Sequence, residues 1–78
     1  MNEGANPQIL VEICTEKMPF GKYKGTLIAD LPVSYLEWFM RQGMPKGKLG
    51  MQLHTIYEIK LNGLTDLLIP VKQQLRKM

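Results

Sequence analysis

Residues 21–25, with the sequence GKYKG, carry the side chains best suited to bind an anion. An aromatic ring can stack on a nucleobase, and the ammonium groups of flanking lysines can contact phosphates. Glycine adopts a positive φ without a Cβ clash, so Gly21 and Gly25 can form a turn that brings backbone amides close to a ligand. The stretch predicts a binding site for DNA or RNA.

Two interpretations of Tyr23 stay open from the sequence. In the first, its ring stacks on a base; in the second, it packs on the core and the lysines beside it only solubilise an exposed turn. Further bases would extend the surface if the loop at residues 43–48 folds back beside the turn. The predicted nucleic-acid-binding set is Lys22, Tyr23, Lys24, Arg41, Lys46 and Lys48, with Gly21 and Gly25 forming the turn.

Side chains that usually carry catalysis or bind metals are scarce, because the chain has one histidine and one cysteine. His54 and Glu58 stand four apart and could face one metal ion, but two ligands do not complete a site. A surface pair at this helical spacing is the favoured interpretation. We predict no catalytic residue, no metal and no cofactor, and we do not expect an enzyme.

The predicted element that would position the turn is a β-hairpin over about residues 18–29. Pro19 cannot donate to a ladder, so its strand would be short or lie at an edge. Residues 26–29, TLIA, are β-prone and would form the returning strand. Together with the helix that follows, this hairpin would make residues 18–39 the signature of the domain.

The helix after the hairpin has two possible starts. Ser34 and Glu37 match the capping-box pattern, and Pro32 would also suit a first turn; Gly43 supplies a stop. Trp38 and its neighbour Phe39 diverge by about 100° on a helix, so one is expected in the core and the other partly exposed. Packing inside the protein is the favoured role for Trp38.

Three more helical segments are expected. The first covers about residues 7–16 behind an Asn6 cap, with a strand as the rival interpretation; the longest covers about 48–62 and stops at Asn62-Gly63. A turn at 64–68 then leads to a helix beginning near Pro70. The predicted fold is α+β, one domain over residues 1–78 in the order α-β-β-α-α-α, with residues 1–5 frayed or disordered.

Composition places limits on the class of protein. A chain of 78 residues with 45% hydrophobic residues and a net charge of +3 fits one small globular domain. No apolar run is long enough to span a bilayer, and the acidic N-terminus lacks the pattern of a signal peptide. The lone Cys14 cannot form an internal disulfide and is expected to be buried. These features predict a cytoplasmic protein, and the bases concentrated in residues 17–48 suggest an anionic partner.

A family resemblance rests on four ordered blocks, MPFGKYKG, DLPVSYLEWF, KGKLG and YEIKLNGL. Over about residues 7–71 the chain resembles short bacterial proteins of unknown biochemical function, catalogued as putative quorum-sensing-regulated virulence factors. The first two blocks are also similar, more loosely, to a C-terminal module of DnaQ-like exonucleases such as exonuclease X. This second resemblance implies that the module works close to nucleic acid.

Two functional hypotheses follow. The leading one is a non-catalytic module that binds nucleic acid, or assists a nuclease, through the basic GKYKG turn. The alternative is a module for protein–protein interaction or homodimerisation, linked to quorum-sensing or virulence regulation, that uses Met44, Met51 and an exposed aromatic side chain. An enzymatic function has the least support from the residues present.

Overall fold

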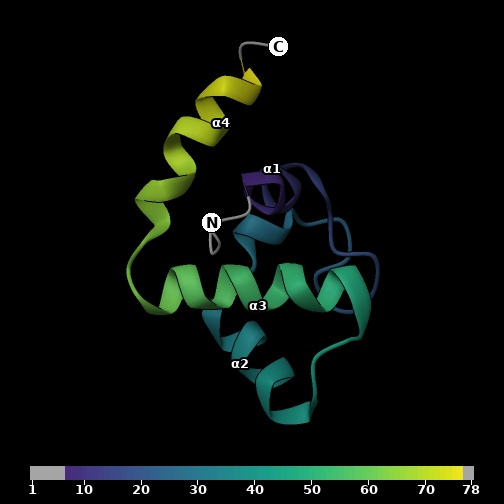
Figure 1. The fold of residues 1–78 in the computed structure, drawn as a ribbon. Helices are drawn as coiled ribbons and strands as arrows, with labels where there is room; N and C mark the ends of the chain where they lie inside the picture. Colours follow the sequence, from purple (N-terminus) through teal and green to yellow (C-terminus); the bar gives the residue numbers. More distant parts are fainter. Residues whose placement is uncertain (1–6, 77–78) are drawn as a thin grey trace.

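The computed structural model describes residues 7–76 (Figure 1). Its elements are, in order, α1 (Pro7–Thr15), η1 (Ile28–Asp30), α2 (Val33–Gln42), α3 (Gly47–Leu61), η2 (Thr65–Leu67) and α4 (Leu68–Arg76). Within this part of the chain there is no named strand. The expected fraying of residues 1–5 and the expected Asn6 cap lie outside the described residues.

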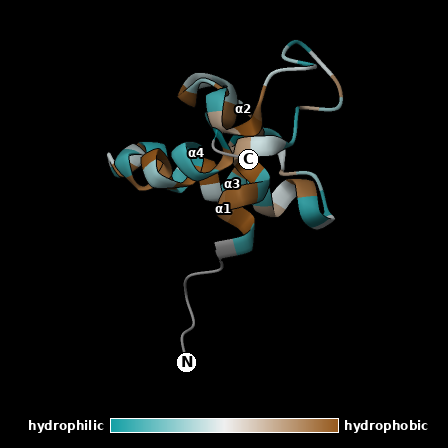
Figure 2. Cartoon of the chain, turned by 90° about the horizontal axis from the view of Figure 1, so that it is seen from above, coloured by the Kyte–Doolittle hydropathy of each residue, from teal (hydrophilic) through white to brown (hydrophobic). Residues whose placement is uncertain are grey.

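Helix α3 is the centre of the fold. It packs against α1, α2 and η1, while α4 packs against α1. In Figure 1, α1 and α4 lie above α3, and α2 lies below it. Seen from above, the hydrophobic residues concentrate where α1, α2 and α3 meet (Figure 2). The largest fully buried side chains are Ile13, Met18, Ile28, Leu31, Leu36, Leu53 and Ile56.

The predicted α+β class and its β-hairpin are wrong. Residues 16–27 form a loop that is joined by one isolated antiparallel bridge, between Lys17 and Leu27. The bridge does not extend because Met18 and Ile28 are both buried in the helical core, and the chain turns into η1 directly after Leu27. The glycine-framed sequence that suggested a hairpin therefore forms the tip of a compact loop.

The helical predictions are confirmed with small changes of boundary. The segments expected near 7–16 and 48–62 are α1 and α3, and Gly63, with φ of 67°, follows the end of α3. The expected turn at 64–68 is η2, and Pro70 lies in the first turn of α4, where its missing amide hydrogen removes no helical bond.

The predicted capping box is wrong. Helix α2 begins at Val33, so Ser34 lies inside its first turn, and no side chain caps it. Pro32, the second start that the sequence allowed, occupies the cap position. Its carbonyl oxygen accepts from the amides of Tyr35 and Leu36 at 3.1 and 3.2 Å. The backbone alone thus sets the start of the helix that carries the aromatic residues.

Two smaller features complete the fold. No helix among residues 7–76 is long and apolar enough to cross a membrane. Gly50 on α3 is buried, and a Cβ at this position would overlap the carbonyl oxygen of Pro45. Glycine is therefore required here for the α2–α3 connection to lie against α3.

Candidate nucleic-acid interface

The loop that carries GKYKG is closed by its own backbone. The amide of Met18 donates to the carbonyl of Thr26, and the amide of Gly25 donates to the carbonyl of Met18, both at 2.8 Å. Gly21 and Gly25 have φ of 81° and 89°, in the left-handed region that glycine adopts without a Cβ clash. Because Met18 is only 1% exposed, these bonds tie the loop to the core.

A hollow of about 490 Å³ lies between this loop and α2. One wall is the loop and the other is the exposed side of the helix. Its volume falls in the range of about 300–1,000 Å³ typical of small-molecule sites. The residues that line it are Phe20, Gly21, Lys22, Tyr23, Ser34, Tyr35, Trp38 and Phe39. We call this feature the aromatic hollow.

The rings of the aromatic hollow contact one another. Tyr35 is the shared partner: its ring centroid lies 4.6 Å from that of Tyr23 and 5.1 Å from that of Phe39. It lies 6.4 Å from the ring of Trp38, with planes only 6° apart. Burial, and then the nearby Tyr23, raise the pKa of the Tyr35 hydroxyl. The hydroxyl therefore keeps its proton at neutral pH and can donate a hydrogen bond.

Tyr23 packs as the second interpretation predicts, and the proposed stacking on a base stays a prediction. Its ring is partly buried and packs against the core, yet it also lines the aromatic hollow. The ammonium nitrogen of Lys22 lies 5.6 Å from the centroid of this ring, within the range of a cation–π contact. Tyr23 is therefore both a packing residue and part of the lining of the aromatic hollow.

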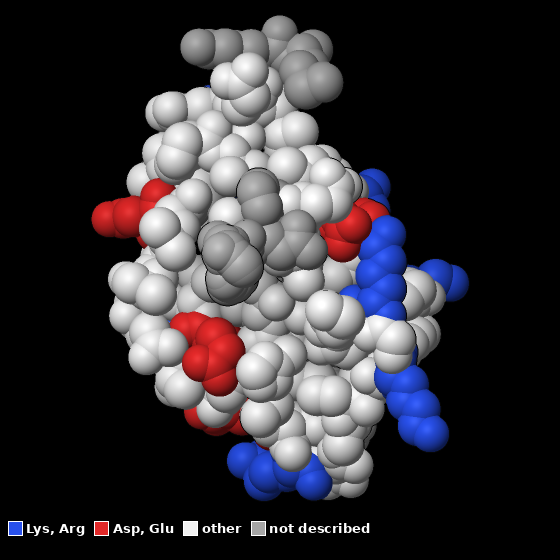
Figure 3. All heavy atoms as spheres, in the orientation of Figure 1, with Lys and Arg blue, Asp and Glu red and all other residues white. Residues whose placement is uncertain are grey.

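The remaining predicted bases lie in three different places. Lys24 is exposed on the loop, Arg41 is exposed in the last turn of α2, and Lys46 is exposed just before α3. None of these lines the aromatic hollow. In Figure 3, Lys and Arg side chains gather toward the right and lower edges of this face, and acidic side chains lie mainly to the left.

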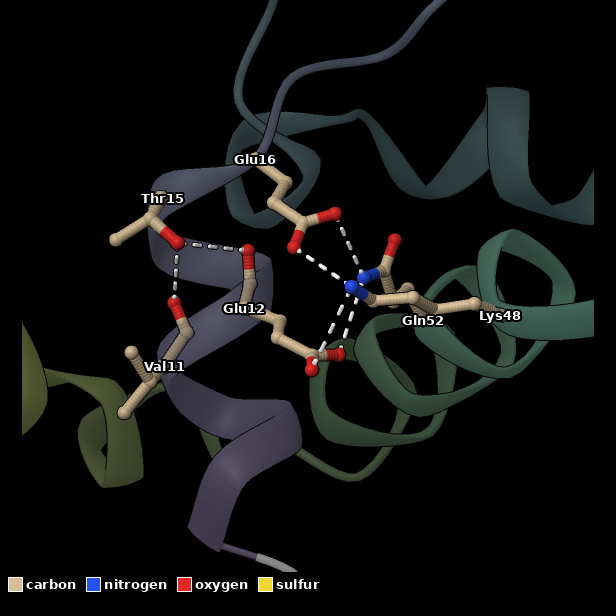
Figure 4. A network of polar contacts seen from close by, with 6 residues as sticks. All are labelled: Val11, Glu12, Thr15, Glu16, Lys48 and Gln52. Carbon is tan, nitrogen blue, oxygen red and sulfur yellow. Dashed lines mark hydrogen bonds and ion pairs between the residues drawn. The ribbon is translucent and has the colours of Figure 1, made fainter.

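Lys48 is held by carboxylates. Its ammonium nitrogen lies 3.1 Å from a carboxylate oxygen of Glu16 and 3.7 Å from one of Glu12. The amide of Gln52, which is 2% exposed, donates to the same two carboxylates at 3.1 and 3.2 Å. Figure 4 shows this network joining α1 to α3. We call these four residues the polar seam.

The polar seam shifts the pKa values of its members. The hydrogen bond from Gln52, followed by that from Lys48, lowers the pKa of Glu16. The hydrogen bond to Glu16 raises the pKa of Lys48. Both shifts favour the charged forms, so the pair stays ionised at neutral pH. Lys48 is therefore less available to an outside anion than its place in the sequence suggested.

Sequence reasoning missed part of the aromatic hollow. Trp38 was expected in the core, but its side chain is 47% exposed, and Phe39, at 7%, takes the core position. Phe20, also 47% exposed, was not singled out. The signal that could have found them was the spacing: Tyr35 and Trp38 stand three apart on one face of a helix, and Phe20 adjoins the glycine turn.

Other reactive groups have ordinary surroundings. His54 and Glu58 form the exposed pair expected at helical spacing, with 3.8 Å between nitrogen and oxygen. Cys14 is buried as predicted, and burial raises the pKa of its thiol. Among residues 7–76, no group of three or more His, Cys, Asp or Glu side chains is placed to hold a metal ion.

The comparisons with known proteins agree with the resemblance noted from the sequence. The model of the family described as "Putative quorum-sensing-regulated virulence factor" matches residues 6–71, so the chain belongs to this family. It is 49% identical over 67 residues to the uncharacterized protein YpeB of Escherichia coli K12, a match that covers 85% of this chain and 93% of the relative. The YpeB protein of Escherichia coli O157:H7 matches to the same extent. No solved structure matches the chain significantly.

Proposed function

We propose that this protein is a non-catalytic module that binds DNA or RNA and assists a nuclease or a similar enzyme. The observation that carries this proposal is the aromatic hollow, whose lining among residues 7–76 combines five aromatic residues with one lysine and no carboxylate. Aromatic faces next to cations suit a ligand in which bases alternate with phosphates.

The loop lysines are the main proposed phosphate contacts. Lys22 lines the aromatic hollow and Lys24 is exposed two residues further on, so both can approach one backbone. Arg41 and Lys46 are exposed and would contact phosphates further along a longer strand. Lys48 contributes less because Glu12 and Glu16 already neutralise it.

The test is a fluorescence-anisotropy titration of labelled single- and double-stranded oligonucleotides at low salt. Contacts with about four phosphates give a log–log salt slope of about −3. The double substitution Lys22→Glu/Lys24→Glu is expected to weaken binding at least about tenfold, since it replaces two attractive charges with repulsive ones.

The matched control is Lys72→Glu/Arg76→Glu, which changes the net charge equally on α4. This helix lies at the upper left of Figure 1, across α3 from α2. The control is expected to lower affinity much less than the loop variant. An equal loss in both variants, or no binding to any oligonucleotide at high micromolar protein, contradicts the proposal.

A second candidate function is protein–protein interaction. The observation that favours it is a shallower apolar hollow of about 380 Å³ beside the start of α3, lined in part by Met44, Met51 and His54. Met51 is 62% exposed there, and flexible thioethers adapt to varied protein surfaces.

Light scattering coupled to size-exclusion chromatography tests self-association. If the wild-type protein forms a dimer, the Met51→Glu variant should be monomeric. A wild-type protein that is monomeric at every concentration measured excludes the homodimer.

A further inference from the structure

Two half-exposed rings line the aromatic hollow from its two walls. Phe20 comes from the loop and Trp38 from α2, and each is 47% exposed. Large aromatic side chains give their greatest stabilisation when they are buried, and clustered exposed rings mark binding surfaces. The pair therefore indicates a ligand with flat apolar faces.

The ring on α2 is held in place before any ligand arrives. Phe39, which is 7% exposed, meets Trp38 edge-on with 5.0 Å between ring centroids. The opposite wall is fixed by the two backbone bonds between Met18 and the end of the loop. A preformed site loses little conformational entropy on binding, so ring contacts translate more fully into affinity.

The charge of the aromatic hollow restricts the ligand further. Within the described part of the chain, residues 7–76, Lys22 is the charged residue of the lining, and no Asp or Glu side chain belongs to it. A quaternary ammonium, which aromatic cages commonly bind, would be repelled by this lysine. A neutral hydrocarbon would form no charge interaction with this lysine. An aromatic ring joined to a phosphate satisfies both the rings and the cation.

We infer that the aromatic hollow receives one unpaired nucleobase, stacked on Trp38 or Phe20, with its neighbouring phosphate beside Lys22. This inference rests on the proposed function and narrows the ligand to single strands and unpaired ends. In a duplex the base faces are already stacked on their neighbours, and extruding a base costs free energy. The protein is therefore expected to prefer single-stranded nucleic acid.

Trp38 provides a direct readout because it is the only tryptophan in the chain. Three oligonucleotides with equal numbers of phosphates are titrated: a single strand of about 12 nucleotides, the same length made of abasic residues, and a blunt-ended hairpin whose loop consists of abasic residues. The single strand is expected to quench Trp38 fluorescence and to bind about tenfold tighter than the abasic strand. It is also expected to bind tighter than the hairpin.

The order of affinities separates this inference from the proposed function. Electrostatic attraction alone favours the hairpin, because duplex DNA has the higher charge density. If the hairpin and the abasic strand bind at least as tightly as the single strand, without quenching, the inference is overturned and the proposed function stands. If no probe binds, both are overturned.

Two variants test the stacking role separately. Phe20→Leu and Trp38→Leu are each expected to weaken binding of the single strand several-fold, up to about tenfold, and to leave the abasic strand unchanged. Met40→Leu is the matched control, since Met40 is 42% exposed on the same helix but does not line the aromatic hollow. Circular dichroism confirms that each variant is folded. Unchanged single-strand affinity in both folded variants overturns the stacking role.

Discussion

The polar seam and the aromatic hollow use lysine in opposite ways. In the polar seam, Lys48 contacts two carboxylates, and the buried amide of Gln52 donates to both of them. In the aromatic hollow, Lys22 lies over the ring of Tyr23, and no carboxylate of residues 7–76 lines this hollow beside it. The polar seam therefore joins α1 to α3, whereas the aromatic hollow keeps a cation available for a ligand.

This difference shows that a lysine in a basic stretch of the sequence does not always have its charge available to a binding partner. Both lysines are exposed, and both lie in the basic middle of the chain. A carboxylate neighbour neutralises the lysine in an ion pair, while an aromatic neighbour attracts the ammonium group without neutralising its charge. Changes in the polar seam should alter stability more than binding, and changes at the aromatic hollow should alter binding more than stability.

The largest expected effect is that of Gln52→Glu in the polar seam. The substitution keeps the shape of the side chain but adds a third carboxylate at a position that is 2% exposed. We expect the free energy of unfolding to fall by about 3 kcal/mol at neutral pH, because a buried charge would lose its hydrogen bonds and face two like charges. Urea denaturation measures this loss.

The pH dependence of that variant checks the cause. Burial and like charges raise the pKa of the introduced carboxyl in the folded state, so the loss should shrink as the pH falls and the group binds a proton. Gln73→Glu on the exposed face of α4 is the control and should change stability by less than about 0.5 kcal/mol. A pH-independent loss would rule out the electrostatic explanation.

A smaller effect is expected from alanine at the two loop glycines. Gly25 has φ of 89° and open space around its Cβ position, so Gly25→Ala should cost about 1 kcal/mol of backbone strain. Gly21 has a similar φ of 81°, but its Cβ would lie 3.1 Å from the Tyr35 hydroxyl oxygen. Gly21→Ala should therefore cost about 2 kcal/mol.

The comparison of these two variants isolates the contact with Tyr35. Thermal unfolding gives their stabilities, and oligonucleotide titration gives their affinities. Gly21→Ala is expected to weaken binding more than Gly25→Ala, because it displaces a ring of the aromatic hollow. Equal effects of the two variants on both measurements would show that only backbone strain matters.

The smallest expected effect is the acid sensitivity of the polar seam. The folded-state pKa of Glu16 lies below its ordinary value of 4.5. Its contribution to stability is therefore present above that value and is lost as the pH falls through the lower, folded-state pKa. Urea midpoints measured over this acidic range should fall more steeply for the wild type than for Glu16→Gln. Parallel curves would count against the assigned shift.

The helices could be predicted because their signals are local. Proline, glycine and the spacing of apolar residues act within one turn, and they located α1, α3 and the break before α4. The loop could not be predicted, because its glycines and β-prone residues equally suit a hairpin. What decides its conformation is tertiary packing: Met18 and Ile28 are buried in the helical core, and the only pairing among the described residues of the loop is the bridge between Lys17 and Leu27.

The candidate site was predicted in part for a similar reason. The GKYKG turn and the positive φ of its glycines follow from residue types alone. The pairing of Lys48 does not follow from residue types, because its partners lie in α1 and directly after it, far away in the sequence. Gln52, which lies on α3 like Lys48, is likewise 36 residues from its partner Glu16. The exposure of Trp38 was missed because Trp38 and Phe39 are adjacent and both suit a core position, although the spacing of Tyr35 and Trp38 on one helix face was a signal for it.

The buried Cys14 can serve as a probe of local unfolding. Cys14 is 7% exposed on the buried face of α1, and burial raises the pKa of its thiol, so the reactive thiolate is scarce while the fold is closed. Alkylation by an added reagent must then await a fluctuation that lifts α1 from the core. The labelling rate of this single thiol thus measures how often the N-terminal helix detaches in the intact, unmodified protein.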